Sequence, residues 1–408
     1  MRYVVMYNRE WVKPNMNLNT INKDSKCIVS LVNSGILEVD FYKYSINFYD
    51  AAECIIRFLL EEAAENKDIA KLDLWYFAMV YLYRHSLELL LKACIFKSVK
   101  DNTKKIIVEN IRHDLKQAFE QITVSYNLSI QDDSNAKWLN DYLSDISKLD
   151  KESDVFRYPF GIKFKTYFQT QKNISLVATH ANMNKAFNII KDIYNNGILT
   201  KNYYYDYPPE LIIEGGNYYQ QSVIGYKYSA NSFYPYFSSY YEVGGFLKNL
   251  IISKNKINIF IPMCYLYRNA IELALKRMII EDSHINIEKA TKILQRKKHS
   301  ILALWNSIAS EVDEYIDVPD GDTSVEDAIN LIHLIHNFDK HSDMFRYPCD
   351  KKLNSYFLQE KDFDVKNVAS CIEGLCNFLD SIDGMLLSIK EYEADMMAEM
   401  SGYYDYYE

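Results

Sequence analysis

The chain has 408 residues, of which 49% are hydrophobic and 25% are charged, and its formal net charge is −9 at pH 7. These values are typical of a globular protein of two or three domains, and the acidic balance argues against a general polyanion binder while leaving room for a local basic site. No apolar run predicts a membrane span, Met1–Asn8 lacks the pattern of a signal peptide, and the seven cysteines form no CxxC pair, so we expect a cytoplasmic protein with reduced thiols.

Short strands are expected at the start of the chain. Arg2–Tyr7 is one candidate, and Cys27–Val32 and Ile36–Phe41 flank Asn33–Gly35 in a pattern typical of a β-hairpin. Similar candidates in the second half are Leu211–Ile213 and Ser222–Ile224, on either side of a Gly-Gly-Asn turn.

Helical patterns follow in the first half. Leu72–Val99 is apolar on nearly every face, which predicts a central buried helix. Amphipathic patterns predict further helices at Asn47–Asn66, Asn102–Thr123, Ser134–Lys148 and Ser175–Asn195. Pro159 disfavours helical geometry at the residue before it, so the helical run ends there, and Lys163–Phe168 is expected to be extended.

The second half shows the same order of elements after a tyrosine-rich junction at 200–241. Helices are expected at Tyr240–Ser253, Ile257–Ile280, Ile285–Val312, Ser324–Phe338 and Asp364–Tyr392. We expect the junction to pack between the halves, because tyrosine combines a large contact area with a polar tip. The acidic tail Ser401–Glu408 is expected to be frayed.

Two pairs of motifs predict an internal duplication. Tyr81–Lys92 (YLYRHSLELLLK) and Tyr265–Lys276 (YLYRNAIELALK) are identical at eight of twelve positions. Asp150–Pro159 (DKESDVFRYP) and Asp339–Pro348 (DKHSDMFRYP) are identical at eight of ten. We therefore expect a mainly α protein of two tandem helical bundles, with units at 1–199 and 200–408 and short β-hairpin elements before each bundle.

The repeated motifs carry a polar constellation. Arg84, Glu88 and Lys92 are spaced by four residues and share one face of an otherwise apolar helix, with His85 at its edge. Such charges need partners. The candidates in the first half are His113, Asp150, Asp154 and Arg157. The second half offers Arg268, Glu272, Lys276, His299, Asp339, Asp343 and Arg346, with Asn269 in place of His85.

Two interpretations of this constellation stay open. In the first, Glu88 pairs with Arg157 or Arg84 and holds the FRYP loop against the central helix as a structural network. In the second, the residues form a small catalytic site, in which His and Glu perform acid–base chemistry and Arg holds a phosphate. The candidate site residues are then Glu88, His113 and Arg157, with Glu272, His299 and Arg346 in the second half.

The order of helices, and a polar helix followed by an Arg-containing motif, resemble the HEPN superfamily (higher eukaryotes and prokaryotes nucleotide-binding domain). The resemblance covers nearly residues 45–195 and 230–390, and the RHxxELxLK, His-x-Leu and FRYP motifs are also similar to those of a group of uncharacterised bacterial proteins. HEPN domains are bundles of four or five helices, and many are metal-independent ribonucleases of bacterial toxin–antitoxin, phage-defence and CRISPR systems. The resemblance therefore implies RNA or a nucleotide as ligand, no cofactor, and a site at the interface of an intramolecular pseudo-dimer.

The chain departs from the ribonuclease pattern at one point. Ribonuclease members carry Arg, four to six residues, then His, and neither Arg157 nor Arg346 is followed by such a His. His113 and His299 must replace it if the chain cleaves RNA. This departure and the acidic charge favour a non-catalytic or degenerate HEPN-like component of a bacterial defence or toxin-type system that binds a partner protein or a nucleotide. The alternative is a metal-independent ribonuclease-like effector. Neither function involves a membrane.

Two further features are a group of three histidines and two short basic runs, and each has a simple structural interpretation. His333, His336 and His341 have a spacing that zinc accepts, but the first half has Ser144, Ser147 and Glu152 in those places, so we interpret them as a histidine cluster without metal. The basic runs Lys104–Lys105 and Arg296–Lys298 precede the repeated histidines. A solvated helix end is the favoured interpretation, and a phosphate contact is the alternative.

Overall fold

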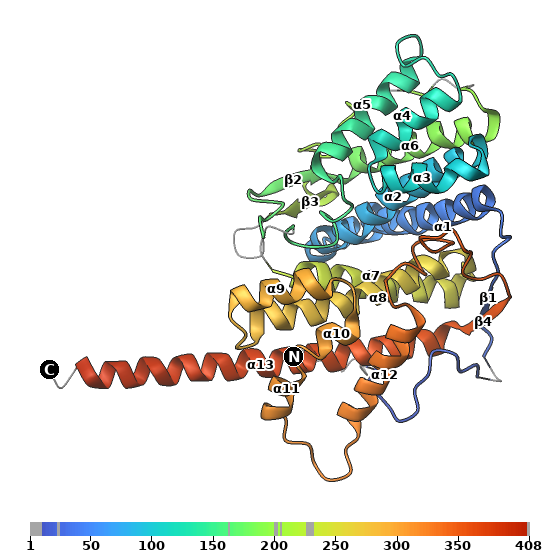
Figure 1. The fold of residues 1–408 in the computed structure, drawn as a ribbon. Helices are drawn as coiled ribbons and strands as arrows, with labels where there is room; N and C mark the ends of the chain where they lie inside the picture. The colour runs from blue at the N-terminus through green and yellow to red at the C-terminus, as the bar shows by residue number, and fades with distance from the viewer. Residues whose placement is uncertain are drawn as a thin grey trace.

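The computed structural model describes residues 10–22, 25–161, 164–199, 203–204, 206–225 and 232–405. The chain is mainly helical, with two small antiparallel sheets in the described part, so the expectation of a mainly α protein is confirmed (Figure 1). Among the described helices, none combines the length and the apolar character that a membrane crossing requires. All seven cysteines are free, and five of them are buried.

The described part of the first half contains six α-helices, and the second of them is the predicted central one. These are α1 (Leu37–Phe58), α2 (Ile69–Ser98), α3 (Asp101–Ile111), α4 (Leu115–Ser125), α5 (Ser134–Leu149) and α6 (Leu176–Asn196), with a π-helical turn η1 (Leu59–Ala63) after α1. Side chains at the N-caps of α2, α4 and α5 accept hydrogen bonds from the first free backbone N–H groups, and the acceptors are Asp68, Asp114 and Asp133.

The second half follows a similar order, with shorter helices in its middle and a longer last helix. It contains α7 (Tyr234–Lys254), α8 (Phe260–Arg277), α9 (Ile287–Lys297), α10 (Ile301–Trp305), α11 (Ala309–Tyr315), α12 (Ser324–Phe338) and α13 (Val365–Asp405), with 3₁₀ turns η2 (Tyr218–Gln220) and η3 (Ile257–Ile259) and a π-helical turn η4 (Met278–Asp282). The helix expected at Ile285–Val312 is therefore three helices, and that at Asn102–Thr123 is two. The expectation of a frayed tail is wrong for 401–405, because α13 continues to Asp405; residues 406–408 lie outside the described residues.

The strands pair differently from the expected hairpins. β1 (Ile28–Leu31) pairs antiparallel with β4 (Lys361–Asp364), and β2 (Lys172–Ser175) pairs antiparallel with β3 (Gln221–Ile224). The residues expected as the second hairpin strand, Ile36–Phe41, instead begin α1. The reason lies in Asp40, whose carboxylate accepts hydrogen bonds from the backbone N–H groups of Ser34 and Gly35 at 2.8 and 3.0 Å and so fixes a helix start. The candidate strand Arg2–Tyr7 lies outside the described residues.

Each sheet joins the start of one half to the end of the other. β1 opens the first half and β4 lies near the end of the second, while β2 lies near the end of the first half and β3 opens the second. An isolated bridge between Ile174 and Glu214 extends the second sheet. The two halves are therefore intertwined through their strands.

The core is continuous between the halves. Helix α2 packs against α1, α4, α6 and α7, and α8 packs against α7 and α13. In Figure 1, α1 and α2 lie between α3–α6 above and α7–α8 below, and α13 runs beneath α7 and α8, above α11 and α12, and projects beyond the other helices. Tyr236 and Tyr240, from the junction and the start of α7, donate hydrogen bonds to the carbonyls of Val155 and Phe156 in the first FRYP loop. This part of the expected junction does pack between the halves.

Candidate functional site

Helix α2 carries a line of charged side chains into the core. Arg84, Glu88 and Lys92 lie four residues apart, as the spacing predicts, and their exposed fractions are 0%, 2% and 5%. Arg84 pairs with Oε2 of Glu88, and Lys92 donates to Oε1 at 2.7 Å. Because an unpaired buried charge costs several kcal/mol, these three groups stabilise one another.

Helix α8 repeats this line with a longer contact between the arginine and the glutamate. Arg268 lies 3.5 Å from Oε2 of Glu272, and Lys276 donates to Oε1 at 2.7 Å. All three side chains are buried. Both halves thus hold one glutamate between a preceding arginine and a following lysine.

A histidine from the next segment completes each line. Nδ1 of His113 lies 3.0 Å from Oε1 of Glu88, and Nδ1 of His299 lies 3.0 Å from Oε1 of Glu272. An ionised carboxylate only accepts hydrogen bonds, so each histidine donates Nδ1–H and keeps a free electron pair on Nε2. The side chains of His113 and His299 are 29% and 33% exposed, and the hydrogen bonds of both rings within the described structure are made by Nδ1. The paired ring therefore offers a base toward solvent.

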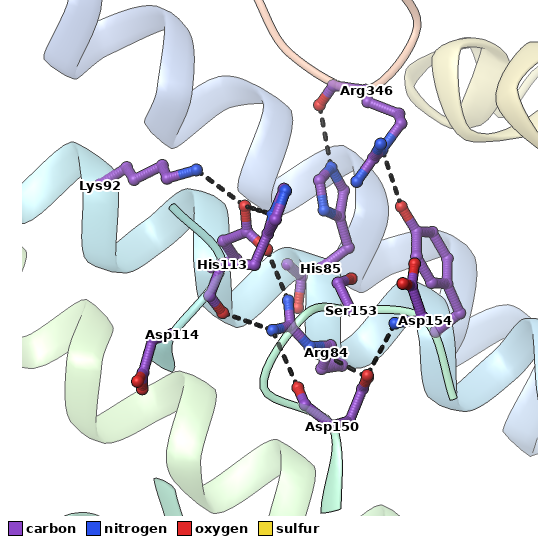
Figure 2. Close-up of polar contacts among 12 residues, drawn as sticks. Arg84, His85, Lys92, His113, Asp114, Asp150, Ser153, Asp154 and Arg346 are labelled. Carbon is purple, nitrogen blue, oxygen red and sulfur yellow. Dashed lines mark hydrogen bonds and ion pairs between the residues drawn. The ribbon is translucent and has the colours of Figure 1, made fainter. Parts of the chain in front are cut away.

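The arginine of each central helix fixes the turn that carries the histidine. Arg84 donates to the backbone carbonyl of His113, and its Nε lies 3.3 Å from the carboxylate of Asp150 (Figure 2). Arg268 donates to the carbonyl of His299 at 2.7 Å. Arg84 therefore links α2, the histidine turn and the FRYP segment. Of the two arginines expected as partners of Glu88, it is Arg84 that pairs with this glutamate and connects it to the FRYP segment.

A tyrosine from the opposite half reaches each glutamate. Tyr347 donates to Oε1 of Glu88 at 2.7 Å, and Tyr158 donates to Oε1 of Glu272 at 2.7 Å. Both tyrosines belong to FRYP motifs, and neither was singled out from the sequence. The repeated Tyr-Pro after the arginine was the signal that could have indicated them. Each site is thus composed of residues from both halves.

The FRYP arginines lie behind these tyrosines. Arg157 donates to the carboxylate of Asp154 at 2.6 Å, whereas Arg346 donates to the hydroxyl of Tyr81 at 3.1 Å. Their guanidinium groups lie over the rings of Tyr158 and Tyr347, each at 5.1 Å from the centroid. Among the ion pairs of the described residues, none joins either arginine to a central glutamate. The structure therefore brings Glu88 to His113 and Glu272 to His299, and keeps Arg157 and Arg346 apart from them.

The electrostatics of each site favour an ionised glutamate and a neutral histidine. Burial opposes ionisation of Glu88, but the neighbouring Lys92, His113 and Arg84 hold its pKa well below the usual range. Burial lowers the pKa of His113 against the opposing effect of Glu88. Burial raises the pKa of Tyr347 well above the usual range, so its hydroxyl stays a donor. At neutral pH the site thus presents an unprotonated imidazole supported by a carboxylate.

The two halves differ at one buried position beside the sites. Nε2 of His85 donates to the carbonyl of Arg346 at 2.9 Å. The shorter Asn269, fully buried at the equivalent place, has no hydrogen-bond partner for either amide atom within the described structure. A buried amide without partners costs free energy. The second half therefore lacks a contact that stabilises the first.

The remaining candidates do not add to this site. Within the described residues, no group of three or more His, Cys, Asp or Glu side chains has an arrangement that could hold a metal ion, His333, His336 and His341 included. A cavity of about 270 Å³ lies elsewhere, between the start of α2, β3 and α7, with apolar side chains such as Phe77 and Phe168 on its walls.

The chain was compared with known proteins. No protein-family model, no curated protein and no solved structure matches it.

Proposed function

We propose that the protein is a ribonuclease-like enzyme that acts without a metal ion and carries two composite sites, one at His113 and one at His299. In each site Nε2 of the histidine takes the proton of a ribose 2′-hydroxyl, and the 2′-oxygen attacks the adjacent phosphorus to form a 2′,3′-cyclic phosphate. The P–O5′ bond breaks, the leaving 5′-oxygen takes a proton from water, and the imidazolium later returns the first proton to the solvent. The carboxylate at Nδ1 holds the ring in one tautomer and stabilises the imidazolium that forms. The observation that carries the proposal is the Nδ1–carboxylate contact of 3.0 Å in both halves, with Nε2 left toward solvent.

The resemblance to HEPN domains supports this proposal from the sequence side. Enzymes of that superfamily place their sites at a dimer interface, and here Tyr347 and Tyr158 cross between the halves to reach Glu88 and Glu272. The same resemblance extends the proposal to a role in a bacterial defence or toxin-type system. The histidine comes from the turn before α4 or α10 rather than from the segment after FRYP.

A second candidate is a non-catalytic component that binds a partner protein or a nucleotide. The observation that favours it is that the carboxylate of Glu88 is fully occupied by contacts within the protein. Its Oε1 alone contacts Lys92, His113 and Tyr347, which is the pattern of a structural network between the halves.

An RNA-cleavage assay of the purified protein with EDTA present tests the first candidate. We expect His113→Ala/His299→Ala to lower the rate by about 10²–10⁴-fold while the melting temperature changes little, because a general base contributes to rate more than to packing. His180→Ala is a matched control, since His180 is also 29% exposed and lies 3.0 Å from a glutamate, Glu53.

The outcome decides between the candidates. Cleavage that the double variant loses and the control keeps supports the enzyme. A wild-type protein that leaves RNA intact, or a double variant that cleaves as well as the wild type, contradicts it and supports the binding component.

A further inference from the structure

A basic residue in a strained conformation directly precedes each site histidine. Arg112 has φ 50° and ψ −103°, and Lys298 has φ 50° and ψ −105°. The backbone N–H of Asp114 donates to the carbonyl of Ile111 at 3.0 Å and closes a tight turn with Arg112 and His113 at its centre. These angles are those of a type II′ turn, in which the position of Arg112 is normally occupied by glycine.

The same turn recurs in the second half. Ser300 donates to the carbonyl of Lys297 at 3.0 Å across Lys298 and His299. A non-glycine residue in this region carries backbone strain, and such strain is concentrated at functional sites. Glycine would relieve it in both halves, yet one half has arginine and the other has lysine. The two residues differ in shape and share a positive charge.

The charge at these positions is not used within the protein. Both side chains are exposed, and no ion pair involving Arg112 or Lys298 occurs in the described part of the chain. The buried cations Arg84 and Lys92 already pair with Glu88, so they are not available to a ligand. Arg112 and Lys298 are therefore free cations placed one residue from a base that faces solvent.

We propose that Arg112 and Lys298 hold the phosphate backbone of a single-stranded RNA and so place a 2′-hydroxyl at Nε2 of the adjacent histidine. The inference rests on the proposed ribonuclease-like function and names its substrate contacts. A phosphate bound beside the histidine lies next to the ribose whose hydroxyl the histidine deprotonates, so one turn orders both groups. A single strand fits because its flexible backbone can bend to a turn that projects between two helices.

Binding of a fluorescent 2′-O-methyl RNA oligonucleotide, followed by anisotropy at several salt concentrations, tests this assignment apart from catalysis. The probe lacks the attacking hydroxyl and stays intact. Arg112→Gln/Lys298→Gln keeps a non-glycine residue in the turn and removes the charge. We expect about tenfold weaker binding, a salt dependence reduced by about one counterion per site, and an unchanged melting temperature.

Two further pairs separate charge from backbone strain. Arg112→Gly/Lys298→Gly should weaken binding equally while the melting temperature stays the same or rises, since glycine suits the turn. Arg112→Lys/Lys298→Arg should bind like the wild type. Lys137→Ala/Lys289→Ala is the control, because it removes two exposed charges elsewhere.

The possible results are distinct for the two proposals. Equal binding of the probe by the wild type and the Gln pair, or no binding by the wild type, overturns the assignment. Loss of binding in the Gln pair without any RNA cleavage by the wild type leaves the phosphate contacts standing and removes the catalytic proposal. Cleavage that depends on the histidines, together with unaffected binding by the Gln pair, supports the catalytic proposal and removes the phosphate contacts.

Discussion

The hydroxyl of Tyr347 donates to the carboxylate of Glu88 at 2.7 Å, although 259 positions separate the two residues in the chain. Tyr158 and Glu272 form the equivalent contact in the opposite direction. Each half therefore supplies a hydrogen bond that the buried glutamate of the other half requires.

The first prediction concerns these two tyrosines. Tyr347→Phe and Tyr158→Phe should each lower the free energy of unfolding by about 1.5–3 kcal/mol, because each removes a hydrogen bond to a buried charged group. Denaturant titration measures the change. Tyr204→Phe is the control, since Tyr204 is 88% exposed and should leave stability unaltered. Equal stability of all three variants would show that the contacts across the halves contribute nothing.

The second prediction concerns the glutamates themselves. Glu88→Ala should destabilise the fold by roughly 3–5 kcal/mol, because it removes the carboxylate that pairs with both buried Arg84 and buried Lys92. Glu272→Ala should have a similar effect through Arg268 and Lys276. Thermal melting and denaturant titration measure both. A melting temperature that barely moves would contradict the internal ion-pair network.

The third prediction uses the difference between the halves at His85 and Asn269. Asn269→His should stabilise the protein by about 1 kcal/mol, because the longer side chain can reach the carbonyl of Arg157 as His85 reaches that of Arg346. The reciprocal His85→Asn should destabilise it by about 1–3 kcal/mol, since it leaves a buried acceptor unpaired. Calorimetry of both variants checks the pair. A destabilised Asn269→His would mean that the second half has no room for the ring.

The fourth prediction concerns pH. Burial, together with the neighbouring carboxyl group of Asp282, raises the pKa of Asp383 to about 8 although Arg277 opposes the shift. A carboxyl group whose pKa is higher in the folded state than its unfolded value of 3.8 binds more protons when folded, so its contribution to stability is full below that value and is lost as pH rises toward 8. Asp383→Asn should therefore raise stability at pH 8 by roughly 1–3 kcal/mol.

The same variant should also flatten the fall in stability between pH 4 and 8. Unfolding free energies of the wild type and Asp383→Asn at several pH values test this. Parallel pH profiles for the two proteins would show that Asp383 titrates as an ordinary carboxyl group.

The helices with a strong periodic pattern were predictable from sequence, and their connections were less so. α2 and α5 lie within a few residues of Leu72–Val99 and Ser134–Lys148. The turns at Arg112 and Lys298 divide two expected helices, because strain at a non-glycine residue leaves no local signal. The hairpin at Asn33–Gly35 failed because Asp40 fixes a helix start, and no local pattern indicates that β1 pairs with a strand near the far end of the chain.

The candidate site was also predictable only in part, because some of its residues follow a local sequence pattern and others do not. The spacing of Arg84, Glu88 and Lys92 places three charges on one helix face. Because burying an unpaired charge costs free energy, this placement predicts that the three side chains pair. His113 was found because it recurs in the second half as His299. Tyr347 was not found, because its role depends on contact between the halves, and the arginine before it looked like the functional member of the motif.

The pairing of β1 with β4 has a consequence for how the protein is made. About 330 residues separate Leu31 from Lys361, so β1 leaves the ribosome long before its partner strand exists. At a synthesis rate of about 5–20 residues per second, β1 waits on the order of 15–65 s with its backbone groups unpaired. During this time the first half also lacks Tyr347, and Glu88 lacks its fourth donor. The contacts of Glu88 are therefore incomplete until Tyr347 has been made, whereas Tyr158, Glu272 and His299 of the second site all come earlier in the chain.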